Sequence, residues 1–372
     1  MAKLGDIATY INGYAFKPQD WSDEGIPIIR IQDLTGNSYQ ANRYNGEYAS
    51  KYEVNDGDVL ISWSASLGVY IWHGEKAVLN QHIFKVVFDK KRISKDFFVH
   101  QVGLILENAA SDAHGATMKH LTKPIFDALP FYLPPYEKQC EIAEVLDKVT
   151  SLISLRKQQL AKLDELVKAR FVEMFGDPVN NPMNYPKSQL GKVCDVRDGT
   201  HDSPEYYDVG YPLVTSKNVT GGKIDLSECN LISEDDYKKI CERSKVDRGD
   251  IIMPMIGTVG KPVIVNAEPT FAIKNVALIK FTPDSLVTNI YIKTLLESDY
   301  FDRAVLDKIR GGTQKFIALG DIRKLEIILP DFKHQQCFST FVERVDQQKQ
   351  TVQQSLEKLE LMKKALMQEY FG

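Results

Sequence analysis

Positive charge is not in excess in this 372-residue sequence. Its 46 lysine and arginine residues are outnumbered by 50 aspartate and glutamate residues, and the formal net charge is −4 at pH 7. A basic domain is the usual sign of a nucleic-acid-binding protein, so overall charge does not indicate that class. It does not exclude a local basic groove on an otherwise acidic surface.

Long apolar runs and clustered cysteines are also missing. No run reaches the roughly 18 apolar residues of a membrane span, and the opening MAKLGDIATY lacks a signal-peptide pattern. Five scattered cysteines, without CxxC spacing or a nearby histidine pair, predict reduced thiols and no metal site. We therefore expect a cytoplasmic protein that does not contact a membrane.

One tripeptide points to an enzyme but lacks a necessary partner. Pro134-Pro135-Tyr136 resembles the end of the [Asn/Asp]-Pro-Pro-aromatic signature of enzymes that methylate a flipped-out DNA base. The leading position is Leu133, which has no oxygen to hold the exocyclic amine, and no glycine-rich cofactor turn is found. The prolines are better explained as the end of a strand and the start of a helix. No catalytic residues and no cofactor are therefore predicted in this chain.

What the sequence does contain is an internal repeat. FYLPPYEKQCEIAEVLDKV, from Phe131, returns as IILPDFKHQQCFSTFVERV, from Ile327, 196 positions later. VNDGDVLISWSASLG, from Val54, similarly matches VDRGDIIMPMIGTVG, from Val246. A repeat of this length indicates two copies of a whole domain rather than a short solenoid unit.

Each copy combines a globular part with a long helix. Short β-branched runs such as IPIIRIQDL, DVLISWS and VALIKF predict strands, and KDFFVHQVGLILEN and NIYIKTLLESDYFDRAVLDKI predict helices. The expected class is α+β with mostly antiparallel or mixed sheets. We predict globular domains at residues 1–134 and 177–330, a central helix at 135–176 and a C-terminal helix at 331–372.

The two long segments carry apolar residues at steps of three and four, which is typical of a coiled-coil seam. The simplest partner for each helix is the other, packed antiparallel. This arrangement would separate the two domains by a stiff spacer with an approximate two-fold axis. The predicted helix-pairing residues are Ile142, Leu146, Val149, Ile153, Leu160, Leu163, Val167, Val342, Val345, Val352, Leu356, Leu359, Met362 and Leu366.

Two similar domains at a fixed distance suit a ligand with repeated half-sites, and double-stranded DNA is such a ligand. The strand and helix frames of the copies match, whereas NGYAFKPQDW, from Asn12, and DGTHDSPEYYDVG, from Asp198, do not. Divergent loops predict two different half-sites, and therefore an asymmetric bipartite target.

The repeated Leu-Pro-x-x-x-x-Gln, long helix and Phe-Gly pattern resembles the specificity (S) subunit of type I restriction–modification systems. LPPYEKQ, SLISLRKQQLAKLDELVKARFVEMFGD, LPDFKHQ and the Gly-Asp turns Gly57-Asp58 and Gly249-Asp250 carry the resemblance. It implies two target recognition domains, with helices that set the spacer length and dock two methyltransferase (M) subunits. Those subunits would bind S-adenosylmethionine and methylate adenine. Restriction (R) subunits using ATP and Mg would cleave unmodified DNA, as in phage defence.

DNA contacts are expected to divide between phosphate anchors and base readers. Strand ends and loops before the helices supply polar side chains of suitable type, and Arg30 and Gln32 are expected to share one face of a strand. The first-domain candidates are Arg30, Gln32, Ser62, Trp63, Ser64, Gln81, His82, Lys119, His120 and Lys123. The second-domain candidates are Thr200, His201, Lys217, Asn218, Lys274, Asn275, Gln314, Lys315 and Arg323.

Two other hypotheses remain at this point. One is a stand-alone DNA adenine methyltransferase that uses the Pro-Pro-Tyr tripeptide. The other is a coiled-coil scaffold that bridges proteins without touching DNA. Neither the recognised bases nor the exact spacer length follows from the sequence.

Overall fold

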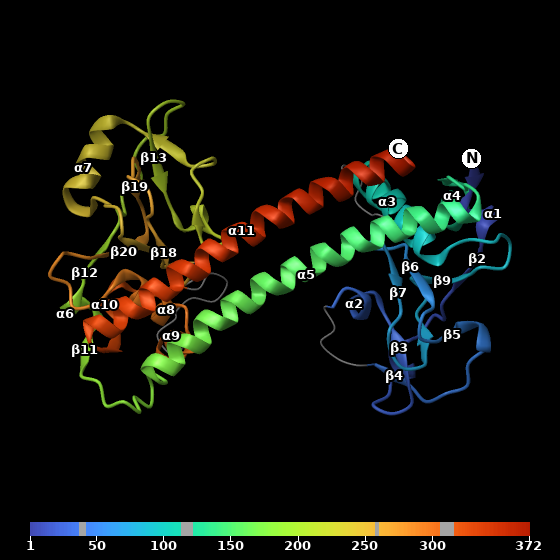
Figure 1. Ribbon diagram of the computed structural model, residues 1–372, viewed down its shortest axis with the longest axis horizontal. Coiled ribbons are helices and arrows are strands. Elements are labelled where there is room, and N and C mark those ends of the chain that lie inside the picture. The colour runs from blue at the N-terminus through green and yellow to red at the C-terminus, as the bar shows by residue number, and fades with distance from the viewer. Residues whose placement is uncertain (37–41, 113–121, 257–259, 306–315) are drawn as a thin grey trace. The chain divides into compact units, whose positions relative to one another are not determined.

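The computed structural model describes residues 1–36, 42–112, 122–256, 260–305 and 316–372 (Figure 1). The chain divides into two compact units, Met1–Lys157 with Gln354–Gly372, and Gln158–Gln353. Each unit therefore contains one globular domain, part of each long helix, and its own core.

The first unit contains two four-stranded sheets and a strand pair. One sheet has the order β2-β9-β6-β7 and is antiparallel, and the other has the order β4-β3-β8-β5, in which β3 and β8 run parallel. β1 pairs with β10. The strands are β1 Ala2–Lys3, β2 Thr9–Asn12, β3 Ile26–Ile29, β4 Arg43–Tyr44, β5 Glu53–Val54, β6 Val59–Ser62, β7 Gly68–Ile71, β8 Ala77–Leu79, β9 Ile83–Val87 and β10 Pro130–Phe131. The helices are α1 Leu4–Ile7, α2 Ile31–Leu34, α3 Lys95–Asp112 and α4 Lys123–Ala128, with 3-10 turns η1 Pro18–Asp20 and η2 Ser50–Tyr52.

The second unit repeats this plan. Its antiparallel sheet has the order β12-β20-β17-β18, and its mixed sheet has the order β16-β13-β19 with β13 parallel to β19. β11 pairs with β21, and β14 with β15. The strands are β11 Lys187–Gln189, β12 Asp195–Asp198, β13 Tyr211–Val214, β14 Val219–Thr220, β15 Lys223–Ile224, β16 Asn230–Ile232, β17 Ile251–Pro254, β18 Val263–Ile264, β19 Ala272–Ile273, β20 Val276–Lys280 and β21 Glu326–Ile328. The helices are α6 Leu190–Val193, α7 Glu234–Ser244, α8 Asn289–Leu296, α9 Asp299–Val305 and α10 Leu319–Arg323, with the 3-10 turn η3 Ser216–Asn218.

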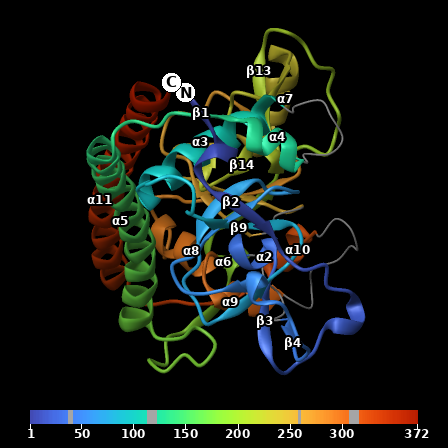
Figure 2. The same cartoon turned by 90° about the vertical axis from the view of Figure 1, so that its right-hand side faces the viewer.

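The predicted α+β class with antiparallel and mixed sheets is confirmed, although two segments differ from expectation. The run from Ile26 is a strand only to Ile29, because Asp33 accepts a hydrogen bond from the Arg30 amide at 2.8 Å and opens α2 beside β3 (Figures 1 and 2). The segment from Asn289 forms two helices, and the first ends at the C-cap residue Glu297.

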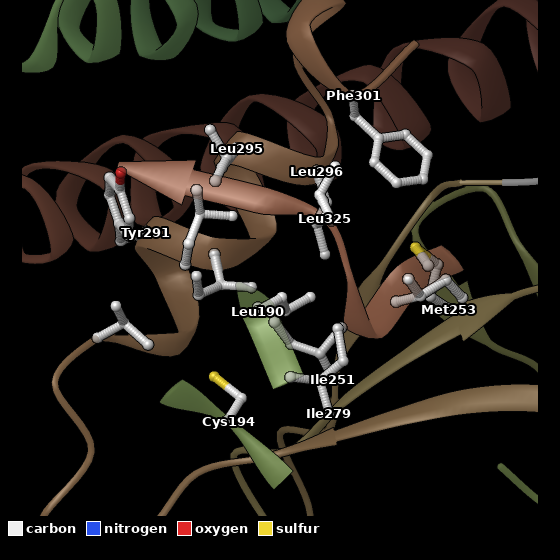
Figure 3. Close-up of a cluster of buried hydrophobic side chains, with 14 of the residues drawn as sticks. Leu190, Cys194, Ile251, Met253, Ile279, Tyr291, Leu295, Leu296, Phe301 and Leu325 are labelled. Atoms are coloured by element: carbon white, nitrogen blue, oxygen red, sulfur yellow. The ribbon is translucent and has the colours of Figure 1, made fainter. Parts of the chain in front are cut away.

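Each domain has a buried core against which the long helices pack. In the second unit, Leu190, Ile251 and Leu295 come from α6, β17 and α8 and converge on one apolar cluster (Figure 3). Tyr291 is fully buried there, and its hydroxyl donates to the Ile328 carbonyl oxygen at 2.9 Å. The same cluster receives Phe171 from a long helix, so the end of that helix belongs to the domain core.

The long helices are α5 Tyr136–Phe175 and α11 Phe332–Phe371, and they pair antiparallel within each unit (Figure 1). In the first unit Leu366 and Phe371 pack on the cluster that contains Ile142 and Leu146. In the second unit Phe171 and Phe175 contact Phe338, with ring centroids 5.6 and 5.4 Å apart respectively. The antiparallel coiled coil predicted from the three-and-four spacing is thus confirmed.

The seam also contains a charged residue. Lys349 lies between the buried Val345 and Val352, and its ammonium pairs with Asp164 of α5 at 2.5 Å. Burial acts to lower the pKa of Lys349, but the hydrogen bond it donates to Asp164, together with the negative charges of Asp164, Asp346 and Glu297, raises the pKa above the ordinary value.

The prediction of Met362 as a pairing residue is wrong. Its side chain is 52% exposed, while Lys363 is half-buried. After the step of three from Leu356 to Leu359, the alternating seam takes a step of four to Lys363 and then three to Leu366. The other predicted pairing residues are buried or half-buried.

Pro134 and Pro135 directly precede α5, as the sequence predicts. Gln139, one turn into the helix and 1% exposed, donates to the Pro134 carbonyl oxygen at 2.8 Å and accepts from the Ser94 amide at 2.9 Å. Gln335 of α11 repeats this pattern with Pro330 and with the Thr288 amide, at 2.8 and 3.0 Å, and adds a bond to the Leu286 carbonyl oxygen. The repeated glutamine therefore ties each long helix to the N-terminus of a domain helix, α3 or α8.

The five cysteines are free thiols. In the part of the chain that the structure describes, no helix is long and apolar enough to cross a membrane.

Candidate nucleic-acid interface

Several strand ends of the first domain meet at one edge. The parallel strands β3 and β8 end there, and the Asn80 amide donates to the Ile29 carbonyl oxygen at 3.1 Å. The Tyr14 amide, just after β2, donates to Leu79 at 2.7 Å. Because carboxyl ends of parallel strands share an edge, residues far apart in sequence become neighbours. The first loop cluster consists of Gly13, Tyr14, Trp21, Arg30, Trp63, Asn80, Gln81 and His82.

The second domain builds an equivalent edge with the same backbone hydrogen bonds. The Lys274 amide donates to the Val214 carbonyl oxygen at 2.8 Å, and the Thr200 amide donates to Ile273 at 3.0 Å. Thr200 and Lys274 also form a parallel bridge, as Tyr14 and Asn80 do in the first domain. The second loop cluster consists of Gly199, Thr200, His201, Thr215, Ser216, Lys217, Lys274 and Asn275.

Aromatic contacts shape the first loop cluster. The Arg30 guanidinium lies over the Trp21 ring, 5.1 Å from its centroid, and Trp21 is 44% exposed. Trp63 stacks on Phe84 at 5.8 Å and lies beside His82 at 5.6 Å. The Gln81 amide nitrogen is 3.1 Å from Nε2 of His82. The predicted residues Arg30, Trp63, Gln81 and His82 are therefore brought to one place.

Three predicted residues of the first domain are placed differently. Ser62 and Ser64 are 0% and 6% exposed, so neither side chain is available to a duplex, and we leave both out of the proposed contact set. The expectation that Gln32 shares a strand face with Arg30 is wrong, because Gln32 lies in α2 and residues two apart on a helix do not face the same side.

The second loop cluster is organised by charge. His201 has Nε2 2.8 Å from Oδ2 of Asp198 and Nδ1 2.9 Å from Oδ1 of Asn275, and Arg243 pairs with the same aspartate. The bonds to Asn275 and then to Asp198 raise the pKa of His201. Burial of Asp198 acts to raise its pKa, but the bonds from His201 and Arg243 prevail and lower it. An imidazolium that donates to both acceptors fits this geometry.

Lysines complete the second loop cluster. The Lys274 ammonium donates to Oγ of Ser203 at 2.7 Å, and Lys217 is exposed on η3. Asn218 is 8% exposed, and its Oδ1 accepts from the amide and hydroxyl of Thr215 at 3.0 and 2.9 Å. Asn218 therefore caps η3, whereas Lys217 and Lys274 remain at the edge.

The remaining candidates do not join these clusters or are outside the described residues. Lys123 pairs with Asp127 at 2.7 Å on α4, and Arg323 donates to the Val196 carbonyl oxygen at 2.9 Å from α10. The residues that lie outside the described ranges are Lys119, His120, Gln314 and Lys315.

Trp21, Tyr14 and Ser203 were not predicted as site residues. Their positions could have identified them, because all three lie in the two loops that differ between the copies. Loops that diverge while the surrounding strands match are where binding residues are expected. The residue types alone did not separate them from core aromatics or solvated hydroxyls.

A metal centre is not indicated: within the described ranges, no group of three or more histidine, cysteine or acidic side chains is arranged to hold an ion. Burial raises the pKa of Cys194 to about 12, which suits an inert core thiol.

The whole chain has relatives among known proteins. A family model described as "Type I restriction modification DNA specificity domain" matches residues 1–165 and 182–361. The type I restriction enzyme EcoBI specificity subunit of Escherichia coli is 23% identical over 378 residues, covering 92% of this chain and 78% of that protein. The MjaVIII specificity subunit of Methanocaldococcus jannaschii is 24% identical over 390 residues, covering 99% and 90%.

Solved structures agree on the fold. The S subunit of a type I restriction–modification system from M. genitalium matches with a TM-score of 0.58 and 13% identity, covering all of this chain and 95% of that one. A chain from a type I system, solved to explain complex assembly and conformational transition, gives 0.55 and 15%, covering 100% and 96%.

Proposed function

Because the chain belongs to the family of type I restriction–modification DNA specificity subunits, and is a non-catalytic DNA-recognition subunit, we propose that its two domains each read one half of an asymmetric bipartite site. We place the two target recognition domains at residues 1–134 and 177–330. The observation that carries the proposal is the pair of loop clusters, which share one backbone hydrogen-bond scheme and differ in their side chains. A shared frame with different readers suits two half-sites of different sequence.

Contacts from the first loop cluster would come from Arg30, Gln81 and His82, with Trp63 as an apolar support. Contacts from the second would come from Thr200, His201, Lys217, Lys274 and Asn275. Arginine, glutamine and asparagine have the bidentate geometry that reads bases, whereas lysine and protonated histidine also neutralise phosphates. The net charge of −4 implies that much of the affinity comes from other subunits that enclose the duplex.

The long helices would set the spacer length and dock two methyltransferase (M) subunits. Apolar side chains outside the seam support such docking, because exposed apolar patches mark interaction surfaces. The M subunits would supply S-adenosylmethionine for adenine methylation, and restriction (R) subunits with ATP and Mg would join the same complex. The exposed residues in question are Leu152, Leu155, Leu166 and Val172 on α5, and Leu361 and Met362 on α11.

The test is methylome sequencing of cells with and without this chain. The expected result is a bipartite motif with an unspecified central spacer that is lost on deletion. Exchanging residues 1–134 for those of a related subunit should change one half of the motif only. Inserting one helical turn near Arg156 should change the spacer length.

Two results would contradict the proposal. Binding of labelled S-adenosylmethionine to the purified chain would favour a methyltransferase. A DNA-binding constant of the chain with M subunits that is indifferent to salt would favour a scaffold, because phosphate contacts release counterions.

A further inference from the structure

Trp21 and Arg30 form a cation–π pair at the first loop cluster. Trp21 follows η1 in the divergent loop, and Arg30 directly follows β3 at the first loop cluster. The guanidinium lies 5.1 Å from the centroid of an indole that is 44% exposed. Such a cation–π contact uses no hydrogen-bond acceptor, so the guanidinium N–H groups can still bind one.

Both members of the pair have a fixed backbone. The Arg30 amide donates to Asp33, and the Arg30 carbonyl oxygen accepts from the Asp33 amide at 3.0 Å. Next to Trp21, Ser22 exchanges two backbone hydrogen bonds with Arg43 of β4, at 2.9 and 3.1 Å. Such preorganisation reduces the entropy cost of binding.

Other cations of the first domain are paired with carboxylates. Arg43 pairs with Glu75 at 2.9 Å and Lys85 pairs with Asp58 at 2.8 Å. Within the described residues, no ion pair joins Arg30 to a carboxylate. Its five N–H donors therefore remain for a ligand that approaches the strand ends.

We infer that Arg30, held by Trp21, is a specificity-determining residue that reads a guanine in the first half-site. This inference rests on the proposed function. Arginine donates bidentately to the two acceptors on the major-groove edge of guanine, and this is the commonest specific contact to a base. The cation–π contact with Trp21 limits where the guanidinium lies at the strand ends.

The second domain lacks this reader. After β13 the position equivalent to Arg30 is Thr215, because Ile29 and Val214 accept the equivalent bonds from Asn80 and Lys274. The Thr215 hydroxyl is bound to Asn218 at 2.9 Å. Guanine reading by this position is therefore confined to the first half-site.

The experiment uses the chain assembled with its M subunits and duplexes in which each base pair of the first half-site is changed singly. Arg30→Gln should reduce the preference for guanine at one position by about 10- to 100-fold and shift it toward adenine, because glutamine pairs with adenine. Arg30→Lys should weaken the preference, since lysine lacks the planar fork. Trp21→Ala should relax the same position, and Trp21→Phe should retain most of the preference.

Arg92→Gln is the matched control. Arg92 is also stacked on an aromatic ring, Tyr136, at 4.0 Å. It lies beyond the end of β9, whereas the first loop cluster lies at the start of that strand. Its substitution should leave the base preference unchanged.

The outcomes separate the inference from the proposed function. If Arg30→Gln lowers affinity equally for all four bases, Arg30 is a phosphate anchor and the inference is overturned. If the variants keep the native guanine preference, it is overturned as well. Failure of the unmodified complex to bind any bipartite duplex would instead overturn the proposed function.

Discussion

The two globular domains share their strand arrangement and differ in the side chains of their loop clusters. In both domains, the aspartate of the Gly-Asp turn accepts a hydrogen bond from a backbone amide and pairs with a lysine. In both, one glutamine of a long helix is hydrogen-bonded to the domain. At the loop clusters the first domain offers a stacked arginine, and the second offers a histidine held between Asp198 and Asn275. Buried polar groups thus preserve the architecture, while exposed groups on the same strand ends carry the difference.

The comparison is not symmetric in burial. In the Gly-Asp turn of the second domain, Asp250 and Lys280 have side chains 3% and 15% exposed and lie 2.6 Å apart. In the first domain, Asp58 and Lys85 are 27% and 17% exposed and lie 2.8 Å apart. The second domain therefore depends more strongly on its turn.

The largest expected effect is at this turn. Asp250→Ala should lower the free energy of unfolding by about 2 to 3 kcal/mol, because it leaves the Asp247 amide without its acceptor and leaves the buried Lys280 with Asp247 as its remaining carboxylate partner. Asp58→Ala should cost about 1 to 2 kcal/mol. Urea unfolding followed by circular dichroism measures both, and tryptophan fluorescence isolates the first domain, because Trp21, Trp63 and Trp72 all lie there. Equal costs would contradict the asymmetry.

The next largest effect on stability is expected where Gln139 and Gln335 join the long helices to the domains. Gln335→Leu should cost about 2 kcal/mol, and Gln139→Leu somewhat less, because the buried Gln335 makes three hydrogen bonds to backbone groups and the buried Gln139 makes two. Hydrogen exchange at the amides of Thr288 and Ser94 provides a local measurement. Unchanged protection of those amides would show that the glutamines do not hold the joint.

A smaller effect, an increase in stability, is expected from a substitution in the coiled-coil seam. Lys349→Leu should raise the free energy of unfolding by about 1 kcal/mol, since an apolar residue replaces a half-buried ion pair. Lys157→Leu is the control, because its pair with Glu360 is exposed and should change stability by less than about 0.5 kcal/mol. A loss of stability in Lys349→Leu would indicate that the lysine fixes the register of the helices.

The smallest effect is a pH dependence of the second domain. The bonds of His201 to Asn275 and Asp198 raise its pKa, so the imidazole is charged below the ordinary pKa of about 6.5 and loses that charge as pH rises through the raised, folded-state pKa. DNA affinity of the complex should fall by about five-fold at most over that interval, because a surface charge contact is weak. His201→Gln should remove this component from a pH titration of binding, and an identical slope would exclude His201.

Many of the strands and both long helices could be predicted from the sequence because each has a periodic pattern of apolar residues. Alternation and β-branched runs placed the central strands, and steps of three and four placed the coiled coil. Met362 was misassigned because a local step of three looks as acceptable as a step of four until the whole heptad phase is followed.

The loop clusters were only partly predictable. Gln81 and Lys274 could be suggested because they stand between two strands, but their neighbours come from parallel pairings of β3 with β8 and β13 with β19. Such long-range pairings leave no local pattern. Burial of Ser62 and Ser64 and the stacking of Arg30 on Trp21 likewise depend on the assembled sheets.

The joint made by Gln139 and Gln335 touches only main-chain atoms of its domain: the Ser94 and Thr288 amides and the carbonyl oxygens of Pro134, Pro330 and Leu286. These hydrogen bonds to the backbone do not depend on which side chains the domain carries at those positions. Sequence change at those positions can therefore leave the joint intact, while the apolar contacts of Leu146 and Phe171 with the domain cores limit how freely one domain can replace another.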